Sequence, residues 1–334
     1  MYKVAVVGYG YWGPNIVRNF KDHQECEVKY IYDINPESSR RASKQNKDID
    51  IIDDCNIIFD DKDIDIVAIV TPVSAHYPLA KKSLESGKHI FLEKPMTETV
   101  EQAKELIKIA KKKELVGVVD HTFLFTGAVM KIKEIIDSGE IGEITYFDSV
   151  RVNLGIFQHD VDVIWDLAPH DLSILFHLLK DKPNSLVASG VDHLNNGLVD
   201  IAYLNLRYEK KIIANFHINW LSPVKVRKIL IGGSKKMIVY DDMKLSEKIK
   251  IYDAGIHTEN PEQIYNLLIS YRTGDVLSPN ILKTEALKIE ISEFIKQIKN
   301  KSSDSKNDLK NGKNIVKILE ASKKSLKNNE RVIL

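Results

Sequence analysis

The sequence has little cysteine and no long run of apolar residues. It contains 2 cysteines, Cys26 and Cys55, which lie far apart and form no Cys-x-x-Cys pair. Neither a disulfide framework nor a cysteine-based zinc site is therefore expected. No apolar run approaches the roughly 20 residues of a membrane-spanning helix. The run Val4–Val7 is too short for the core of a signal peptide, so we expect a cytoplasmic protein with no membrane association.

An excess of charge of one sign is also absent. The 48 Lys and Arg residues are balanced by 47 Asp and Glu residues, which leaves a formal net charge of +1. This balance argues against a protein that binds nucleic acid. The composition, 43% hydrophobic and 28% charged, is that of an ordinary globular enzyme, and the length of 334 residues favours two domains.

Short apolar runs alternate with amphipathic segments over the first third of the chain. This order predicts an α/β fold that begins with a doubly wound parallel sheet, covered by helices on both faces. The expected strands are Lys3–Val7, Glu27–Tyr32, Ile49–Ile52, Asp65–Val70, Lys88–Leu92 and Leu115–Val119. The expected helices lie near Trp12–Phe20, Pro36–Asn46, His76–Glu85 and Glu98–Lys113.

The pattern changes after residue 122, which divides the chain into expected domains at 1–122 and 123–334. Helix patterns at Thr126–Ser138 and Trp165–Leu179 are followed by a series of strand patterns. This order predicts a carboxy-terminal α/β domain with an open, largely antiparallel sheet. Two closing helices are expected at Ile281–Lys299 and Ile315–Leu326, and the polar stretch Lys299–Lys313 between them is expected to be a mobile surface loop.

A glycine-rich turn follows the first strand. Gly8, Gly10 and Gly13 form a Gly-x-Gly-x-x-Gly motif that includes Tyr11 and Trp12. Such glycines permit a tight turn and let the backbone approach a pyrophosphate. The helix that follows offers N–H groups and a partial positive charge to the phosphates at its amino terminus. The motif therefore predicts a dinucleotide site.

A carboxylate stands where the second strand ends. Asp33 follows Gly13 by 20 residues, a spacing at which an acidic side chain accepts hydrogen bonds from the adenosine ribose. NAD is the expected cofactor, because the 2′-phosphate of NADP would meet the negative charge of Asp33. Arg40 and Arg41 follow in the next helix and could offset part of this repulsion.

Lys94 follows the fifth expected strand, within Glu93-Lys94-Pro95. Ligands of open α/β sheets bind beyond the carboxyl ends of the strands, so Lys94 is expected beside the nicotinamide end of a bound dinucleotide. Pro95 restricts Lys94 to an extended conformation. The alternative is a surface lysine at a strand end, which is the commoner fate of a lone lysine.

Asp166 and His170 lie four residues apart in the second domain. Pro169 can begin a helix that brings His170 to a cleft, where Asp166 could hold the orientation and tautomer of the imidazole. A structural histidine with a capping aspartate is one alternative. A metal site is another, but the spacing of the available side chains fits no standard zinc pattern, and we expect no metal. These side chains are His159, Asp160, Asp162, Asp166, His170 and Asp171.

Taken in order, Gly8–Gly13, Glu93-Lys94-Pro95 and Asp166-x-x-x-His170 resemble the Gfo/Idh/MocA family of NAD(P)-dependent oxidoreductases. The resemblance covers the whole chain. It implies that 1–122 is a Rossmann domain that binds the dinucleotide and that 123–334 binds the substrate and forms oligomers. It also implies a catalytic set of Lys94, Asp166 and His170, in which either Lys94 or His170 is the base.

The resemblance also implies that further residues line the cofactor groove, namely Thr71, Pro72, His76 and Glu93. One position departs from the family pattern. Many members carry an aspartate three residues after the histidine, whereas this chain has Ser173 there and Asp171 directly after His170. The role of that second acid is therefore open.

Three segments resemble a subgroup of the family that acts on nucleotide-linked sugars and includes UDP-N-acetylglucosamine 3-dehydrogenases: Gly8–Asn15, Arg151–Gly155 and Trp165–Asp171. The resemblance implies oxidation of a ring hydroxyl, first of all the 3-hydroxyl of UDP-N-acetylglucosamine, in amino sugar biosynthesis. The alternatives are an inositol-type polyol or aldose dehydrogenase, a reductase of nucleotide-linked keto-sugars, and a non-catalytic NAD-binding sensor.

The residues expected to contact the substrate carry a cation or an amide. Arg151 is the first candidate for the diphosphate, because arginine suits planar, bidentate phosphate contact. Strand alternation places Asn153 on the face of Arg151, and Asn219 is a further polar candidate. Lys225 and Arg227 are the next cations along the chain. A homo-oligomer, a dimer or tetramer, is expected because the second domain has too few helices to cover both faces of its sheet.

Overall fold

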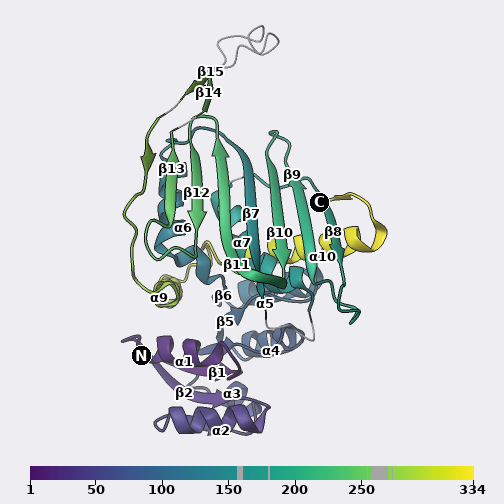
Figure 1. Cartoon of the computed structure of the whole chain (residues 1–334). Helices are drawn as coiled ribbons and strands as arrows, with labels where there is room; N and C mark the ends of the chain where they lie inside the picture. Colours follow the sequence, from purple (N-terminus) through teal and green to yellow (C-terminus); the bar gives the residue numbers. More distant parts are fainter. Residues whose placement is uncertain (156–160, 180, 254, 258–269, 273) are drawn as a thin grey trace. The chain divides into compact units, whose positions relative to one another are not determined.

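The computed structural model describes residues 1–155, 161–179, 181–253, 255–257, 270–272 and 274–334. The chain forms two compact units, each with its own large sheet (Figure 1). The first unit comprises Met1–Phe125 and Thr284–Glu320. The second unit comprises Thr126–Lys283 and Ala321–Leu334.

A six-stranded parallel sheet forms the centre of the first unit. Its strands stand in the order β3-β2-β1-β4-β5-β6, which changes direction between β1 and β4. That change is the switch point beside which ligands bind in doubly wound folds. The predicted doubly wound parallel sheet is confirmed. The strands are β1 (Tyr2–Val7), β2 (Cys26–Tyr32), β3 (Asp50–Ile52), β4 (Ile66–Ile69), β5 (His89–Glu93) and β6 (Gly117–Asp120).

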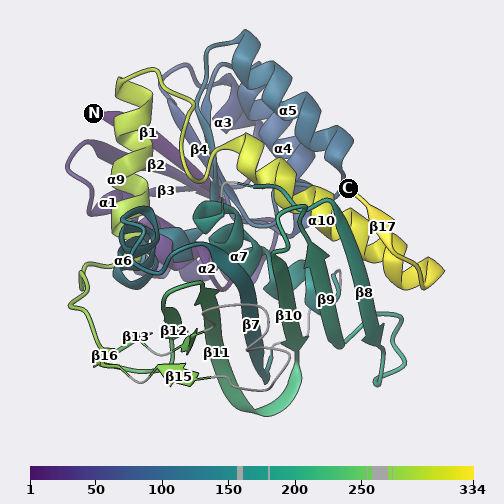
Figure 2. The same ribbon diagram turned by 90° about the horizontal axis from the view of Figure 1, so that it is seen from above.

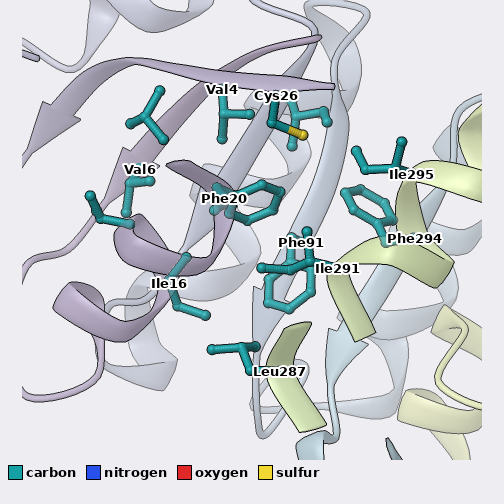
Figure 3. Packing of buried hydrophobic residues seen from close by; sticks show 14 of the residues in the cluster. Val4, Val6, Ile16, Phe20, Cys26, Phe91, Leu287, Ile291, Phe294 and Ile295 are labelled. Carbon is teal, nitrogen blue, oxygen red and sulfur yellow. The ribbon is translucent and has the colours of Figure 1, made fainter. Parts of the chain in front are cut away.

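Helices α1 (Gly13–Lys21) and α9 (Ala286–Lys299) pack into one apolar core with this sheet (Figure 3). Phe91 of β5 contacts Phe20 of α1 and Phe294 of α9, with ring centroids 5.6 Å and 5.7 Å apart. Burial of one such side chain stabilises a fold by roughly 1.5–3 kcal/mol. The apolar face of α9 therefore belongs to the core of the first unit, and it contributes Leu287, Ile291, Phe294, Ile295 and Ile298.

The remaining helices of the first unit complete its layers. α4 and α5 lie on the side of the sheet opposite α9 (Figure 2). Thr99 caps α5 in a capping box with Gln102, since each side chain accepts a hydrogen bond from the backbone N–H of the other residue. The elements are α2 (Pro36–Gln45), α3 (Asn56–Asp60), α4 (Val73–Glu85), α5 (Val100–Lys112) and the short 3₁₀ helix η1 (Thr122–Phe125).

A nine-stranded, largely antiparallel sheet forms the second unit, as predicted. Its order is β16-β13-β12-β11-β7-β10-β9-β8-β17. The central strand β7 pairs in parallel with β10 and antiparallel with β11. β14 (Gly255–His257) and β15 (Ser270–Arg272) form a separate pair. The nine strands are β7 (Ile144–Leu154), β8 (Ser185–Val191), β9 (Ile201–Arg207), β10 (Ile213–Asn219), β11 (Leu221–Gly233), β12 (Met237–Asp241), β13 (Ile249–Tyr252), β16 (Val276–Leu277) and β17 (Val332–Ile333).

Helices α6 (Gly127–Asp137) and α7 (Val163–Leu178) lie against one face of this sheet (Figure 2). Strand β10 has the alternation of a strand covered on one face. Ala214, Phe216 and Ile218 are buried, whereas Asn215 and His217 are partly exposed. α10 (Leu309–Asn328) contributes residues to both units.

The chain is divided differently from the expected cut at 122/123. The segment Thr284–Glu320 belongs to the first unit, because the apolar face of α9 packs on the first sheet. The expected loop Lys299–Lys313 is wrong in its second half. Asp308 accepts a hydrogen bond from the Asn311 N–H at 2.8 Å and so caps α10, and both Asn307 and Asp308 are buried.

No helix within the described ranges combines the length and the apolar character that crossing a bilayer demands.

Candidate active site

The glycine turn after β1 is built so that two of its glycines cannot be replaced without strain. Gly8 has φ +102°, and a Cβ atom there would lie 2.4 Å from the Val70 carbonyl oxygen. A Cβ atom on Gly13 would lie 2.5 Å from the carbonyl oxygen of Gly8. Gly10 differs, because no atom lies within 4 Å of the position of its Cβ. Gly8 and Gly13 thus close the turn, and Gly10 leaves open space above it.

Trp12 occupies the N-cap position of α1, but its side chain makes no capping hydrogen bond. Its indole Nε1 instead donates to Oδ2 of Asp120 at 2.9 Å, at the end of β6. The helix begins with Pro14 in its first turn and without a capping hydrogen bond from its N-cap side chain. Tyr11 is 83% exposed beside it. An uncapped helix amino terminus after a glycine turn is the arrangement that binds a phosphate.

Asp33 is held at the end of β2 by two backbone amides. Its Oδ2 accepts the N–H of Tyr9 at 2.6 Å, and its Oδ1 accepts the N–H of Asn35 at 2.7 Å. Arg41 donates to the carbonyl oxygens of Tyr9 and Gly10. The acidic side chain therefore lies beside the glycine turn with a fixed orientation, and Arg41 braces the same turn.

These residues fit a dinucleotide. The open space over Gly10 is where a pyrophosphate approaches the backbone in this fold. Thr71, after β4, has a buried hydroxyl oxygen without a hydrogen-bond partner among the described residues. Such a group is usually satisfied by water or a ligand. Pro72 follows at the N-cap of α4 and is exposed. The carboxyl ends of β1 and β4 thus carry polar groups for a bound cofactor.

His76 is not a groove-lining residue, which corrects the expectation for it. The side chain is 1% exposed. Its Nδ1 lies 2.8 Å from the carbonyl oxygen of Pro95, and its Nε2 lies 2.8 Å from the carbonyl oxygen of Thr71. The imidazole joins the turn after β4 to the turn after β5. It therefore connects two turns at the ligand-binding edge of the sheet.

Lys94 follows β5 directly, and both Glu93 and Lys94 are partly buried. The bond between Lys94 and Pro95 is a cis peptide. Glu93 is the register partner of Asp120 on β6, so the turns after β5 and β6 are neighbours. His121 follows Asp120 and is 1% exposed. Burial, and then the charge of Lys94, lower the pKa of His121 to about 3, so this imidazole is neutral near pH 7.

Glu290 of α9 forms hydrogen bonds next to the end of β6. It is fully buried, and its Oε1 accepts the backbone N–H of His121 at 3.1 Å and the Nδ2–H of Asn307 at 2.9 Å. Burial and then the negative charge of Asp120 raise the pKa of Glu290 well above its usual range. Sequence reasoning missed this arrangement, which joins three segments that are far apart in the chain.

In the second unit, Asp166 and His170 lie one turn apart on α7. Both are partly exposed, whereas most other residues of this helix are buried. Asp166 Oδ2 accepts a hydrogen bond from Nε1 of the buried Trp220 at 3.1 Å. The indole therefore helps to fix the carboxylate. Sequence reasoning missed Trp220, although a buried tryptophan N–H usually needs a partner.

Arg151 does not present its guanidinium to a diphosphate, which corrects the expectation for it. Its Nε donates to Oδ2 of Asp171 at 2.9 Å, and its Nη2 donates to Oδ1 at 2.7 Å. The two side chains are 4% and 3% exposed. Burial disfavours the charge, but Asp171 raises the pKa of Arg151. The guanidinium is a buried partner of α7.

The other expected substrate residues differ in their freedom to bind. Lys225 is exposed and Asn153 is partly exposed. Asn219 accepts the backbone N–H of Leu221 at 2.6 Å, so it shapes a turn. Arg227 lies 3.5 Å from Asp242, and burial and then the nearby Arg151 lower its pKa.

The expectation of no metal concerned a stretch that includes His159 and Asp160, and these two residues lie outside the described ranges. In the part of the chain that is described, no three His, Cys, Asp or Glu side chains form a group that could hold a metal ion.

Two family models match the chain. Residues 2–121 match the model of the Gfo/Idh/MocA oxidoreductase family with an NAD-binding Rossmann fold, and residues 129–239 match the model of the carboxy-terminal domain of the same family. Among curated proteins, the chain is similar to the oxidoreductase YdgJ of Escherichia coli (strain K12), with 29% identity over 180 residues, 50% of this chain and 51% of YdgJ.

A second curated relative and two solved structures cover more of the chain. The 2,7-anhydro-N-acetylneuraminate hydratase of Mediterraneibacter gnavus is 26% identical over 74% of this chain and 69% of its own length. The UDP-N-acetylglucosamine 3-dehydrogenase GnnA of Acidithiobacillus ferrooxidans has a TM-score of 0.83 and 21% identity, and the match covers 98% of this chain and 97% of GnnA. The aldose-aldose oxidoreductase of Caulobacter crescentus has a TM-score of 0.83 and 16% identity, over 100% and 99% of the two chains.

Proposed function

We propose that this chain, which belongs to the Gfo/Idh/MocA family of oxidoreductases with an NAD-binding Rossmann fold, oxidises a ring hydroxyl of a nucleotide-linked sugar to a ketone. Its first candidate substrate is UDP-N-acetylglucosamine, oxidised at the 3-hydroxyl. The proposed catalytic residues are Lys94, Asp166 and His170. NAD is preferred to NADP in this proposal, because Asp33 puts a negative charge beside the glycine turn.

One observation carries the proposal. Helix α7 is buried over most of its surface, yet it keeps a titratable pair, Asp166 and His170, partly exposed one turn apart. Leaving a carboxylate and an imidazole accessible on such a helix is typical of a base and the residue that orients it. A sensor that binds the dinucleotide without chemistry would have no use for this pair or for Lys94.

In this proposal, the side chains of the protein carry out one proton transfer and position the groups that take part in it. His170 takes the hydroxyl proton, while Asp166, fixed by Trp220, stabilises the imidazolium that forms. Lys94 polarises the oxygen of the reacting alcohol. The glycine turn, Asp33 and Thr71 would hold NAD, whose nicotinamide would supply the acceptor for the hydride that leaves the carbon of that alcohol. The exchange of roles, with Lys94 as the base, is the alternative within this mechanism.

The substrate class rests on motifs and on similarity. Three segments resemble enzymes that act on nucleotide-linked sugars, namely Gly8–Asn15, Arg151–Gly155 and Trp165–Asp171. The fold matches that of a UDP-N-acetylglucosamine 3-dehydrogenase. Lys225 remains an exposed cation for a diphosphate. The second candidate, a polyol or aldose dehydrogenase, is supported by the match to an aldose-aldose oxidoreductase, which has the same TM-score of 0.83.

The test is a screen of UDP- and dTDP-sugars, free sugars and inositol for a change in nicotinamide absorbance. We expect the UDP-linked amino sugar to react far faster than free N-acetylglucosamine, because binding energy from the nucleotide holds the sugar in place. Equal turnover of free glucose or inositol would replace this proposal by the second candidate.

Two substitutions test the residues. His170→Ala and Lys94→Ala should each lower turnover at least ~100-fold, since a general base contributes ~10²–10⁴-fold, and NAD affinity should stay nearly unchanged. Lys108→Ala, at an exposed position of α5, is the matched control and should not alter turnover. Near-normal turnover of both active-site variants would refute the assignment.

We also propose a homo-oligomer. Several large side chains remain exposed in the second unit, among them Tyr203 at 52% and Val191 at 54%. Light scattering at micromolar concentration should therefore report a mass well above the 38.0 kDa of one chain.

A further inference from the structure

We infer that Arg151 and Asp171 form a clamp that positions His170, an inference that rests on the proposed role of His170 as a base. The Asp171 carboxylate accepts three hydrogen bonds: from Nε of Arg151 at 2.9 Å, from Nη2 of Arg151 at 2.7 Å and from Oγ of Ser149 at 2.8 Å. Both donors come from β7 at the centre of the nine-stranded sheet. Asp171 is the residue directly after His170 on α7.

The clamp is planar and therefore directional. Two parallel N–H···O bonds between a guanidinium and a carboxylate fix the plane of both groups, which a single point charge does not. Adjacent residues of an α-helix differ by about 100° around the axis. Holding Asp171 against β7 therefore sets the direction in which His170 leaves the helix. Rotation of the helix or a shift along its axis would break both bonds.

The helix needs such an external restraint at this point. Pro169 lies inside α7 and has no N–H for the hydrogen bond that would normally reach the Trp165 carbonyl. A proline also disfavours the helical conformation of the residue before it, Ala168. The turn that carries Asp166 and His170 is thus weakly held by its own backbone ladder. The clamp follows that turn by one residue and compensates for the missing bond.

The competing explanation is that this ion pair only stabilises the fold. Substitution of both residues by apolar ones distinguishes the two explanations. Replacing a buried ion pair with apolar side chains of similar volume often leaves stability unchanged, whereas removing one partner leaves an unpaired charge. The double variant Arg151→Met/Asp171→Leu should therefore keep the fold while it removes the directional clamp. If the pair only stabilises, this double variant should behave like the wild type in every assay.

The experiment compares the full-length wild type, Arg151→Met/Asp171→Leu and Arg151→Lys. The matched control is Lys236→Met/Glu140→Leu, which likewise replaces an ion pair of the same unit with apolar side chains. That pair is partly exposed and 3.0 Å long, and Lys236 also lies 4.0 Å from Asp253. Circular dichroism melting and NAD affinity establish that each protein is folded and binds cofactor. Turnover is measured with the sugar that reacts best in the screen. The titration of His170 is followed by NMR of ¹⁵N-histidine-labelled protein, with His170→Gln used to assign its signal.

We expect the apolar double variant to melt like the wild type and to bind NAD normally. Its kcat should fall by ~10–100-fold, because small misplacements of a catalytic group have effects of this size. The His170 signals should shift. Arg151→Lys keeps the positive charge but cannot form two parallel hydrogen bonds with the carboxylate. Its kcat should therefore fall less than that of the double variant. The control pair should change none of these quantities.

Wild-type kcat together with wild-type His170 signals in the folded double variant would overturn the clamp. A double variant that fails to fold leaves Arg151→Lys to decide, because unchanged kcat and His170 signals in that variant would also overturn it. The NMR readout needs no substrate. An inactive wild type with shifted His170 signals in the double variant would contradict the proposed function but support the clamp.

Discussion

Trp12 Nε1 donates a hydrogen bond to Asp120 Oδ2 at 2.9 Å, and this bond joins the glycine turn to the far edge of the parallel sheet. β1 and β6 stand three places apart in the sheet, so the bond spans the carboxyl ends of β4 and β5. The bond therefore connects the two ends of the ligand-binding edge. A cofactor that lies along this edge would meet a turn whose position is set before binding.

The indole bond should matter for cofactor affinity. Trp12→Phe removes the N–H donor and keeps most of the ring, and it leaves the Asp120 carboxylate with one partner fewer. We expect NAD affinity to fall about 5–10-fold, which corresponds to ~1–1.4 kcal/mol and lies within the range that one hydrogen bond typically contributes. Fluorescence titration measures this. A variant with wild-type affinity would show that the turn holds its conformation without this bond.

Substitution of two glycines of the same turn should affect different properties, stability for Gly13 and NAD binding for Gly10. Gly13→Ala places a Cβ atom 2.5 Å from a backbone oxygen and should lower the melting temperature. Gly10→Ala meets no atom within 4 Å and should melt like the wild type. It should nevertheless weaken NAD binding at least 10-fold, because the methyl group occupies the space that the pyrophosphate needs. Undiminished NAD affinity in Gly10→Ala would argue against a pyrophosphate at this turn.

Asp33 should set the preference for NAD. Asp33→Asn keeps one oxygen as an acceptor for backbone amides but removes the negative charge that repels a 2′-phosphate. We expect the ratio of kcat/KM for NAD to kcat/KM for NADP to fall at least 10-fold. Steady-state kinetics with both cofactors decide the point, and a wild type that uses both equally would contradict the premise.

The contribution of Glu290 to the free energy of unfolding should decrease as the pH rises. Its folded pKa lies well above the unfolded value of 4.5, so the folded state holds a proton that the unfolded state has lost. The stability contributed by the protonated group is present below pH 4.5 and disappears as the pH rises toward the folded pKa, by about 1.4 kcal/mol per pH unit.

Glu290→Gln is neutral at every pH and keeps an acceptor for His121 and Asn307. Its free energy of unfolding should exceed that of the wild type, and the difference should grow between pH 5 and pH 8. Urea unfolding at several pH values measures it. Since His121 titrates in both proteins, its contribution cancels in the comparison. A constant difference across this range would mean that Glu290 is charged in the folded state.

The sequence allowed prediction of features that are encoded by neighbouring residues. The parallel strands are short runs of Val and Ile, and the glycine turn lies in six consecutive residues, so both were predicted close to their observed bounds. In each case the signal and the structure have the same local period.

Pairings across the fold could not be predicted in the same way. Alternation identified the face of β7 that holds Arg151, but it could not show that Asp171 packs against that face. A closing helix was expected at Ile281–Lys299, but the sequence of that helix contains no information about which sheet buries it. The cap of α10 is different, because Asp308 is a common N-cap residue and was available as a signal.

The path of the chain has a consequence for synthesis on the ribosome. Residues 284–320 complete the first unit, but they emerge only after residues 126–283 have been made. Until α9 is translated, Phe91 and its neighbours lack the cover of Phe294 and Ile291. A nascent amino-terminal unit therefore exposes apolar surface during most of elongation, which is a condition that favours aggregation and chaperone binding. Carboxy-terminal truncations before residue 299 should consequently produce an insoluble first unit.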